Sequence, residues 1–247
     1  MLPLRCACIL LAGLMAGALS AAAAAAQVYV MESTVTAIGV GSALDMGAAI
    51  SIPAGGHIRA VLPSGKTQTI RGPYEGTVAN LARGQPINED VLSRIANLLR
   101  TGGASESTPG ATRAIHRPAE MLRTAFSWSA IPVATGTVCV EQGRTLTLVR
   151  VASPDAERAI MIDGGNQQQA ELAWEVGSDT TQWPANLTPR NDVTYDVLAP
   201  GHPRRQITLR VLERLPAEDN LLIELSQLGC SAQFEAWIRG KLLAAGK

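Results

Sequence analysis

The chain has 247 residues, of which 47% are hydrophobic, 17% are charged and 4% are aromatic, and its formal net charge is zero. This length allows one large domain or two small ones with buried cores, and the hydrophobic content excludes a chain that is disordered throughout. A neutral chain with few aromatic residues lacks the basic groove and the stacking platforms that nucleic-acid binding requires, so we expect no nucleic-acid partner.

Residues 1–26 have the order of features that marks an export signal. Arg5 gives a short positive start, Ile9 to Leu19 an apolar core, and Ala21 to Ala26 the small residues beside a cleavage site. We expect cleavage near Gln27, a periplasmic or secreted protein and no stable membrane insertion after cleavage. The alternative is an uncleaved anchor, because the apolar segment is just long enough to span a bilayer.

The stretch from Ala49 to Val78 is typical of short antiparallel strands joined by tight turns. Pro53 to Gly56 and Pro63 to Gly65 combine a residue of fixed φ with glycines that tolerate positive φ. We predict one small ladder with an open edge that a partner extends by strand addition. The residues that alternate along its strands, our candidate partner-binding residues, are Ile50, Ile52, Ile58, Ala60, Leu62, Gln68 and Ile70.

The same region resembles the periplasmic domain of FecR-type proteins. The resemblance rests on Gly41 to Ile50, on Ile52 to Gly55, and on Val61 to Lys66 with its Leu-Pro-Ser-Gly turn. It covers about 40 residues of turn and core positions. It implies a compact β-domain that senses or docks in the cell envelope, with no catalytic residues to carry over.

A helix and a linker follow this domain. Apolar residues from Val91 to Leu99 recur at helical spacing, Asn88 is a suitable N-cap, and Arg100 lies in the last turn. The Gly-, Ser-, Thr- and Pro-rich residues that follow have no apolar period. We therefore predict a FecR-like β-domain plus helix over residues 27–100 and a linker over residues 101–127.

The second half, residues 128–247, returns to strand signals and ends in helical ones. We predict a β-sandwich with a C-terminal helical hairpin, so the fold class is mainly β with α. The hairpin comprises Pro216 to Leu228 and Ser231 to Leu243, joined through Gly229 and Cys230. The six runs predicted as strands are 138–140, 145–151, 159–162, 170–176, 193–198 and 207–212.

No motif in the chain identifies a catalytic, cofactor-binding or metal site. Ser64 to Thr67 resembles the end of a phosphate loop, but strands flank it, which favours a turn. His57, His116 and His202 lie far apart in the sequence, without metal-ligand spacing. A catalytic Ser-His-Asp site assembled in space remains open. Trp128, Trp174 and Trp183 suit a sugar-binding platform, although core packing is the commoner role.

Cysteine usage predicts one disulfide. Removal of the signal segment takes Cys6 and Cys8 with it and leaves Cys139 and Cys230 in an oxidising compartment. The alternative is two buried free thiols.

From these features we favour a non-catalytic binding or sensing module that docks an envelope or membrane-sensor protein. Two other hypotheses stay open. One is a secreted hydrolase or carbohydrate-active enzyme, which requires a pocket holding a titratable group with a shifted pKa. The other is a structural component of the envelope, which would self-associate.

Overall fold

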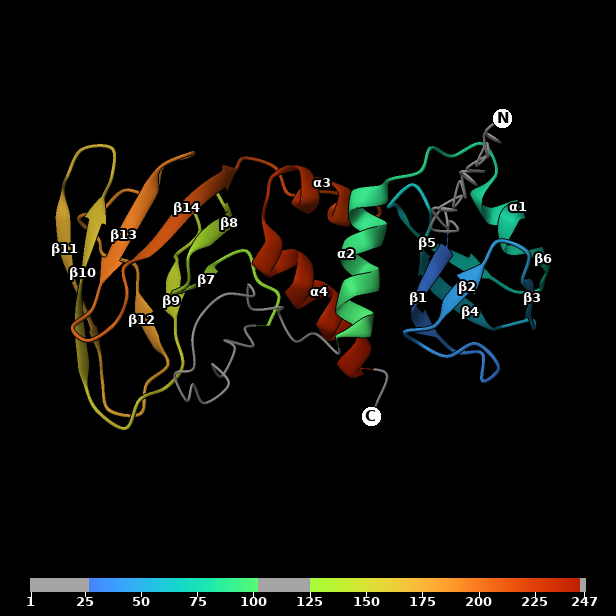
Figure 1. Ribbon diagram of the computed structural model, residues 1–247, viewed down its shortest axis with the longest axis horizontal. Helices are drawn as coiled ribbons and strands as arrows, with labels where there is room; N and C mark the ends of the chain where they lie inside the picture. The colour runs from blue at the N-terminus through green and yellow to red at the C-terminus, as the bar shows by residue number, and fades with distance from the viewer. Residues whose placement is uncertain (1–26, 102–124, 245–247) are drawn as a thin grey trace, which may run out of the picture.

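The computed structural model describes residues 27–101 and 125–244 and has three parts. A β-domain formed by residues 27–77 and a β-sandwich formed by residues 130–212 lie on either side of a helical layer (Figure 1). The predicted signal segment and most of the predicted linker lie outside the described residues. The fold is mainly β with helices, as predicted. The helical layer consists of α2 (Glu89–Arg100), α3 (Leu221–Gln227) and α4 (Ser231–Ala244).

The first domain contains two small sheets. The four-stranded sheet has the order β2-β1-β4-β5, and β3 pairs with β6 in a separate two-stranded sheet. Apolar side chains of both sheets, such as Val28, Ile52 and Ile58, form one core. The elements are β1 (Gln27–Ser33), β2 (Ala43–Asp45), β3 (Ala49–Ile52), β4 (His57–Val61), β5 (Thr67–Arg71), β6 (Tyr74–Thr77) and the short helix α1 (Val78–Ala82).

The prediction of a single ladder from Ile50 to Arg71 was wrong. β4 does pair with β5, but its other edge is occupied by β1, so β3 has no free edge of β4 to join. β3 pairs instead with β6, which follows the break at Gly72 and Pro73. Ile50 and Ile52 therefore belong to a different sheet from Ile58, Ala60, Gln68 and Ile70, and Leu62 directly follows β4. Sequence periodicity indicates strands but not which neighbours they choose.

Helix α2 begins and ends where the sequence indicates. The side chain of Asn88 accepts a hydrogen bond from the N–H of Val91 at 3.1 Å, which satisfies one of the free donors of the first turn. The apolar face of the helix, with Val91 and Ile95 fully buried, points into the molecule. The predicted N-cap and apolar stripe are confirmed.

The second half contains a sandwich, as predicted, with two strands more than the sequence indicated. β7 and β12 have only three residues each, too short for an alternating pattern to stand out. The larger sheet has the order β11-β10-β13-β14-β8 and the smaller has β12-β9-β7, with a shared core between them. The strands are β7 (Ala130–Pro132), β8 (Gly136–Glu141), β9 (Thr147–Val149), β10 (Glu157–Asp163), β11 (Gln169–Trp174), β12 (Thr180–Gln182), β13 (Thr194–Leu198) and β14 (Arg205–Leu212).

The C-terminal helical hairpin packs against both β-domains. Its buried residues share one apolar core with α2 and with Tyr29, Met31 and Val61 of the first domain. The hairpin was predicted to belong to the sandwich, but the sequence could not show this second contact. Helix α3 begins at Leu221, five residues later than predicted, and the backbone oxygen of Asp219 just before it accepts a hydrogen bond from Thr67 of β5 at 2.9 Å.

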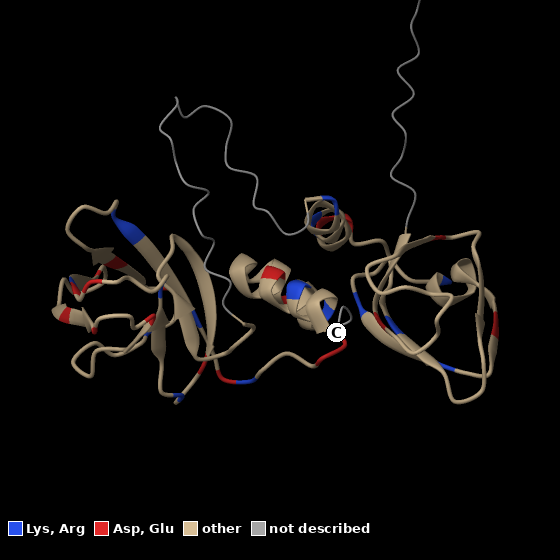
Figure 2. Ribbon diagram, turned by 90° about the horizontal axis from the view of Figure 1, so that it is seen from below, with Lys and Arg blue, Asp and Glu red and all other residues tan. Residues whose placement is uncertain are grey.

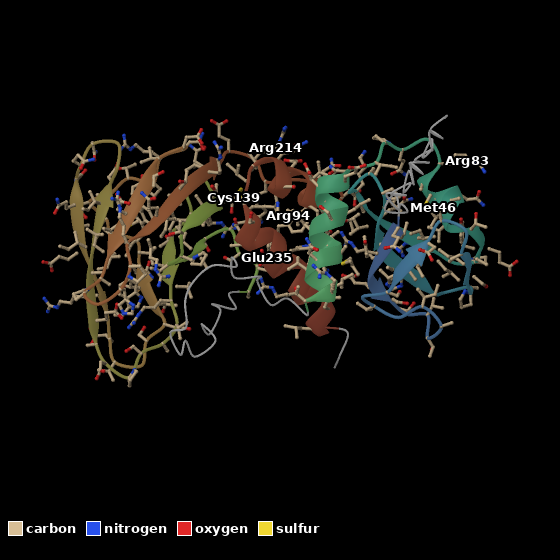
Figure 3. All side chains as sticks on the ribbon, in the orientation of Figure 1. Met46, Arg83, Arg94, Cys139, Arg214 and Glu235 are labelled. Carbon is tan, nitrogen blue, oxygen red and sulfur yellow. A yellow bond between two sulfur atoms is a disulfide. The ribbon has the colours of Figure 1, made fainter. Side chains whose placement is uncertain are left out.

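The predicted disulfide joins the sandwich to the hairpin. Cys139 on β8 and Cys230 between α3 and α4 are bonded, with their Cα atoms 5.8 Å apart. Cys139 faces the helical layer in Figure 3. Beside it, the side chain of Gln233, only 4% exposed, accepts from the N–H of Cys139 at 2.7 Å and donates to its C=O. One amide side chain thus pairs with β8 as a neighbouring strand would.

Candidate functional site

The structure buries most of the candidate partner-binding side chains. Six of the seven face the core of the first domain, and only Gln68 is exposed. These side chains stabilise the domain and are not available to a partner. The six are Ile50, Ile52, Ile58, Ala60, Leu62 and Ile70.

The predicted docking edge is only partly open. The N–H of Leu62 donates to the C=O of Lys66, so Lys66 faces β4. Because backbone groups alternate along a strand, those of Thr67, Thr69 and Arg71 turn away from β4. The N–H of Thr67 is already bonded to Asp219, from the segment before α3. Thr69 and Arg71 remain, a short edge for strand addition.

An open groove of about 890 Å³ lies beside this edge, where the first domain meets the helical layer. The β4–β5 turn, the segment before α2, the first turn of α2 and one residue of α3 surround it. Its large apolar lining residues are Ile87, which is 58% exposed, and Ile223. The lining residues are Ser64, Lys66, Gly84, Gln85, Pro86, Ile87, Asn88, Glu89, Asp90 and Ile223.

Hydrogen bonds fix the walls of the groove. The N–H of Asn88 donates to the C=O of Pro63 at 2.8 Å, which ties the start of α2 to the β4–β5 turn. The hydroxyl of Ser64, 6% exposed, donates to Gln85 at 2.6 Å. Gly65 has a φ of +82°, and a Cβ there would lie 3.0 Å from Ile223, so the turn requires glycine on both counts. The groove is a preformed surface.

The Ser64 to Thr67 segment is the predicted turn. It connects β4 to β5, and a strand follows it where a phosphate loop would need a helix N-terminus. Only the residue types of this segment resemble a phosphate loop, and the elements on either side of it do not.

The titratable groups of the groove are Lys66, Glu89 and Asp90, and all three are exposed. Glu89 and Asp90 lie in the first turn of α2, where negative charge is favourable. Over residues 27–101 and 125–244, no group of three His, Cys, Asp or Glu side chains is arranged to hold a metal ion. Figure 2 shows acidic and basic residues interspersed over the helices and both β-domains.

The most deeply buried carboxylates belong to structural ion pairs in the sandwich. Asp163 is 1% exposed and accepts from Arg190 at 2.6 Å and from the N–H of Gly165 at 2.8 Å. Burial raises the pKa of Asp163, but these hydrogen bonds outweigh it and hold the pKa below its usual value. Hydrogen bonding to Arg204 lowers the pKa of Asp196 in the same way. Carboxylates held charged by a fixed partner are poor proton donors at neutral pH.

Trp128, Trp174 and Trp183 take part in packing, which is the commoner of the two roles considered for them. Trp174 is buried in the sandwich core, and Trp183 packs against the same core with its ring edge on Tyr195. Trp128 lies in a different cluster, beside Phe126 at the helical layer. Because Trp174 is buried and Trp128 lies in a different cluster from Trp183, the three rings form no common sugar platform.

The groove residues from Gln85 to Asp90 were not among the predicted site residues. Their only sequence signal is an apolar residue, Ile87, placed between Pro86 and a helix N-cap. Such a residue usually packs against its own helix as a hydrophobic staple. Its exposure became evident only in the folded chain.

No protein-family model matches the chain, and no curated protein matches its sequence. The resemblance to FecR-type domains therefore rests on the residues quoted for it. In the part of the chain that the structure describes, no helix has the length and apolar character needed to cross a bilayer.

Proposed function

We propose that this protein is a non-catalytic binding or sensing module of the cell envelope, which docks a partner protein in the groove between the first domain and the helical layer. The observation that carries the proposal is the exposed Ile87, held beside Glu89 and Asp90 in a groove with fixed walls. Exposed apolar surface beside charged side chains suits a protein segment.

The chemistry of the groove specifies the segment that it fits. Ile87 and Ile223 offer apolar contact, and Glu89 and Asp90 outnumber Lys66. A segment with one apolar side chain beside a Lys or Arg matches both features. The Leu-Pro-Ser-Gly turn that contributes Ser64 is also part of the FecR-like pattern, which supports docking in the envelope.

The hydrolase alternative requires a titratable side chain with a shifted pKa in a pocket. The groove offers exposed carboxylates in a helix first turn, a position they commonly take for helix stability. This observation favours binding over turnover.

Site-specific crosslinking tests the docking proposal. A photoreactive residue at position 87 should capture a partner in intact cells. Ile87→Asp should abolish capture by a probe at position 66, because it places a third carboxylate in the apolar contact.

Leu243→Asp is the matched control, since Leu243 is 66% exposed on α4 and does not line the groove. Equal capture by the Ile87→Asp and Leu243→Asp proteins would refute the proposal. Point variants are preferable to deletion of residues 27–83, which would strip Tyr29, Met31 and Val61 from the core shared with the helices.

The periplasmic or secreted location is part of the same proposal and rests on the sequence of residues 1–26. The exported protein should begin near Gln27, as measured by intact mass. A chain that keeps Met1 and fractionates with membranes would contradict export with cleavage.

A further inference from the structure

We propose that the outer edge of β11 binds the same edge of a second copy of this chain, which joins two five-stranded sheets through an antiparallel pair of β11 strands. This self-association does not depend on the docking of a partner in the groove. It follows from the open backbone of β11, the apolar side chains beside it and the charges that select one register.

Strand β11 forms one end of the larger sheet of the sandwich. The N–H of Asp163 donates to Gln168 at 2.9 Å, so even-numbered residues of β11 bond to β10 and odd-numbered residues turn outward. The outward C=O of Gln169 accepts from the side chain of Asn186 at 3.0 Å. Within the described residues, the outward N–H and C=O groups of Glu171 and Ala173 have no partner.

The opposite end of the same sheet is covered. Gln233 pairs with both backbone groups of Cys139 on β8, and the N–H of Glu141 donates to Trp128 at 3.0 Å. A bare edge is a template for association unless something blocks it. β11 is longer than β2 and β5, the edges of the first domain's larger sheet. β12 lies close to β11, but among the described residues no hydrogen bond from another segment reaches the outward backbone groups of Glu171 and Ala173.

Apolar side chains lie on the outer face next to this edge. Ile160 on β10 is 44% exposed and lies directly opposite Leu198 on β13, which is 38% exposed. On its other side Ile160 is opposite Glu171. Extending the sheet beyond β11 would cover part of this apolar strip with the side chains of the second copy.

Charge selects the register. If the two-fold axis passes between the Leu172 residues of the two copies, Glu171 of each copy lies opposite Ala173 of the other. Each of these two pairs exchanges two backbone hydrogen bonds. Arg158 is the β10 neighbour of Ala173, so it reaches across this small side chain toward Glu171 of the second copy. An axis at Glu171 would instead place two glutamates opposite each other, which is unfavourable.

Charge reversal tests both the surface and the register. The weight-average mass of the purified protein, followed by sedimentation over a concentration series, should rise from one chain toward two. Glu171→Lys and Arg158→Glu should each weaken the dimer by about tenfold or more, because each sets like charges across the axis. The double variant restores an opposite-charge pair and should recover most of the affinity.

Ala173→Pro provides a second test, since it removes an outward N–H at a sheet edge, where proline is tolerated. It should yield a monomer with a normal circular dichroism spectrum. If that variant misfolds, the charge-reversal set decides the matter. The proposal is overturned if the wild-type protein stays monomeric up to ~0.5 mM, or if the double charge variant associates no better than either single variant.

Discussion

The two β-domains meet the helical layer through different kinds of contact. The first domain is attached by apolar packing of Tyr29, Met31 and Val61, together with ion pairs at its rim. The sandwich is attached by a disulfide and by the paired amide of Gln233. In both cases one edge strand, β5 or β8, donates a backbone N–H to the C-terminal segment. The helical layer and the segment that leads into α3 therefore connect the domains and cover part of one edge of each.

This comparison implies that the sandwich side depends on a few specific bonds and the other side on a distributed surface. Single substitutions should be costly at Cys139, Cys230 or Gln233 and mild at the rim ion pairs. The predictions below follow that order.

Loss of the disulfide should have the largest effect. The bond closes a loop of 91 residues, for which chain entropy gives about 4.6 kcal/mol as an upper, model-dependent figure. Cys139→Ser and Cys230→Ser should lower the melting temperature by similar amounts, and the double variant should add little because both remove one link. Thiol titration of the denatured, unreduced mature protein, which lacks Cys6 and Cys8, checks the bond, and two reactive thiols per chain would disprove it.

Gln233→Leu should come next. It keeps the side-chain volume close to that of glutamine but leaves the N–H and C=O of Cys139 without partners in a buried site. Each unpaired buried group costs about 1–3 kcal/mol, which denaturant unfolding will measure.

Gln227→Leu on the exposed end of α3 is the control and should change the free energy of unfolding little. Equal stability of the two variants would show that the Gln233 amide is not needed at the β8 edge.

The rim ion pair between Lys241 and Glu32 should have the smallest effect. Glu32→Gln should cost no more than about 1 kcal/mol, because both side chains are partly exposed. The hydrogen bond from Lys241 lowers the pKa of Glu32. Stability from a lowered carboxyl pKa is present above the unfolded pKa and is lost as the pH falls through the folded one.

The difference in unfolding free energy between the wild type and Glu32→Gln should therefore begin to shrink as the pH falls below about 4.3, the unfolded pKa, and disappear below the folded pKa of Glu32. Glu213→Gln is the matched control, since Glu213 is exposed in the segment after β14. A constant difference from pH 7 to pH 3 would mean that the charge of Glu32 contributes nothing.

Arg94 lies between the helices and connects all three of them. It projects from α2 over the ring of Phe234 on α4, 4.4 Å from the ring centre, and donates to Ser226 of α3 at 3.3 Å. Figure 3 shows it among the helices near Glu235. Burial lowers the pKa of Arg94 while the nearby charge of Glu235 opposes that effect.

The sequence predicted well what depends on local patterns. The α2 cap at Asn88 and the strands of the sandwich follow from residue types and spacing, and the disulfide from a count of two remaining cysteines. Contacts between distant segments were missed. The pairing of β3 with β6, the covering of Thr67 by Asp219 and the exposure of Ile87 each depend on chain brought together from elsewhere. The spacing of apolar residues along one segment does not indicate which distant segments pack against it.

Hydrogen exchange of individual backbone amides tests the central claim, that the C-terminal helical segment covers one edge of each β-domain. The amides of Thr67 and Cys139 should exchange slowly, because Asp219 and Gln233 accept their hydrogen bonds. The amide of Thr69, two residues along the same edge of β5, should exchange much faster. If Thr67 exchanges as fast as Thr69, or if Cys139 is unprotected, the helical segment does not cover these edges and the account is wrong.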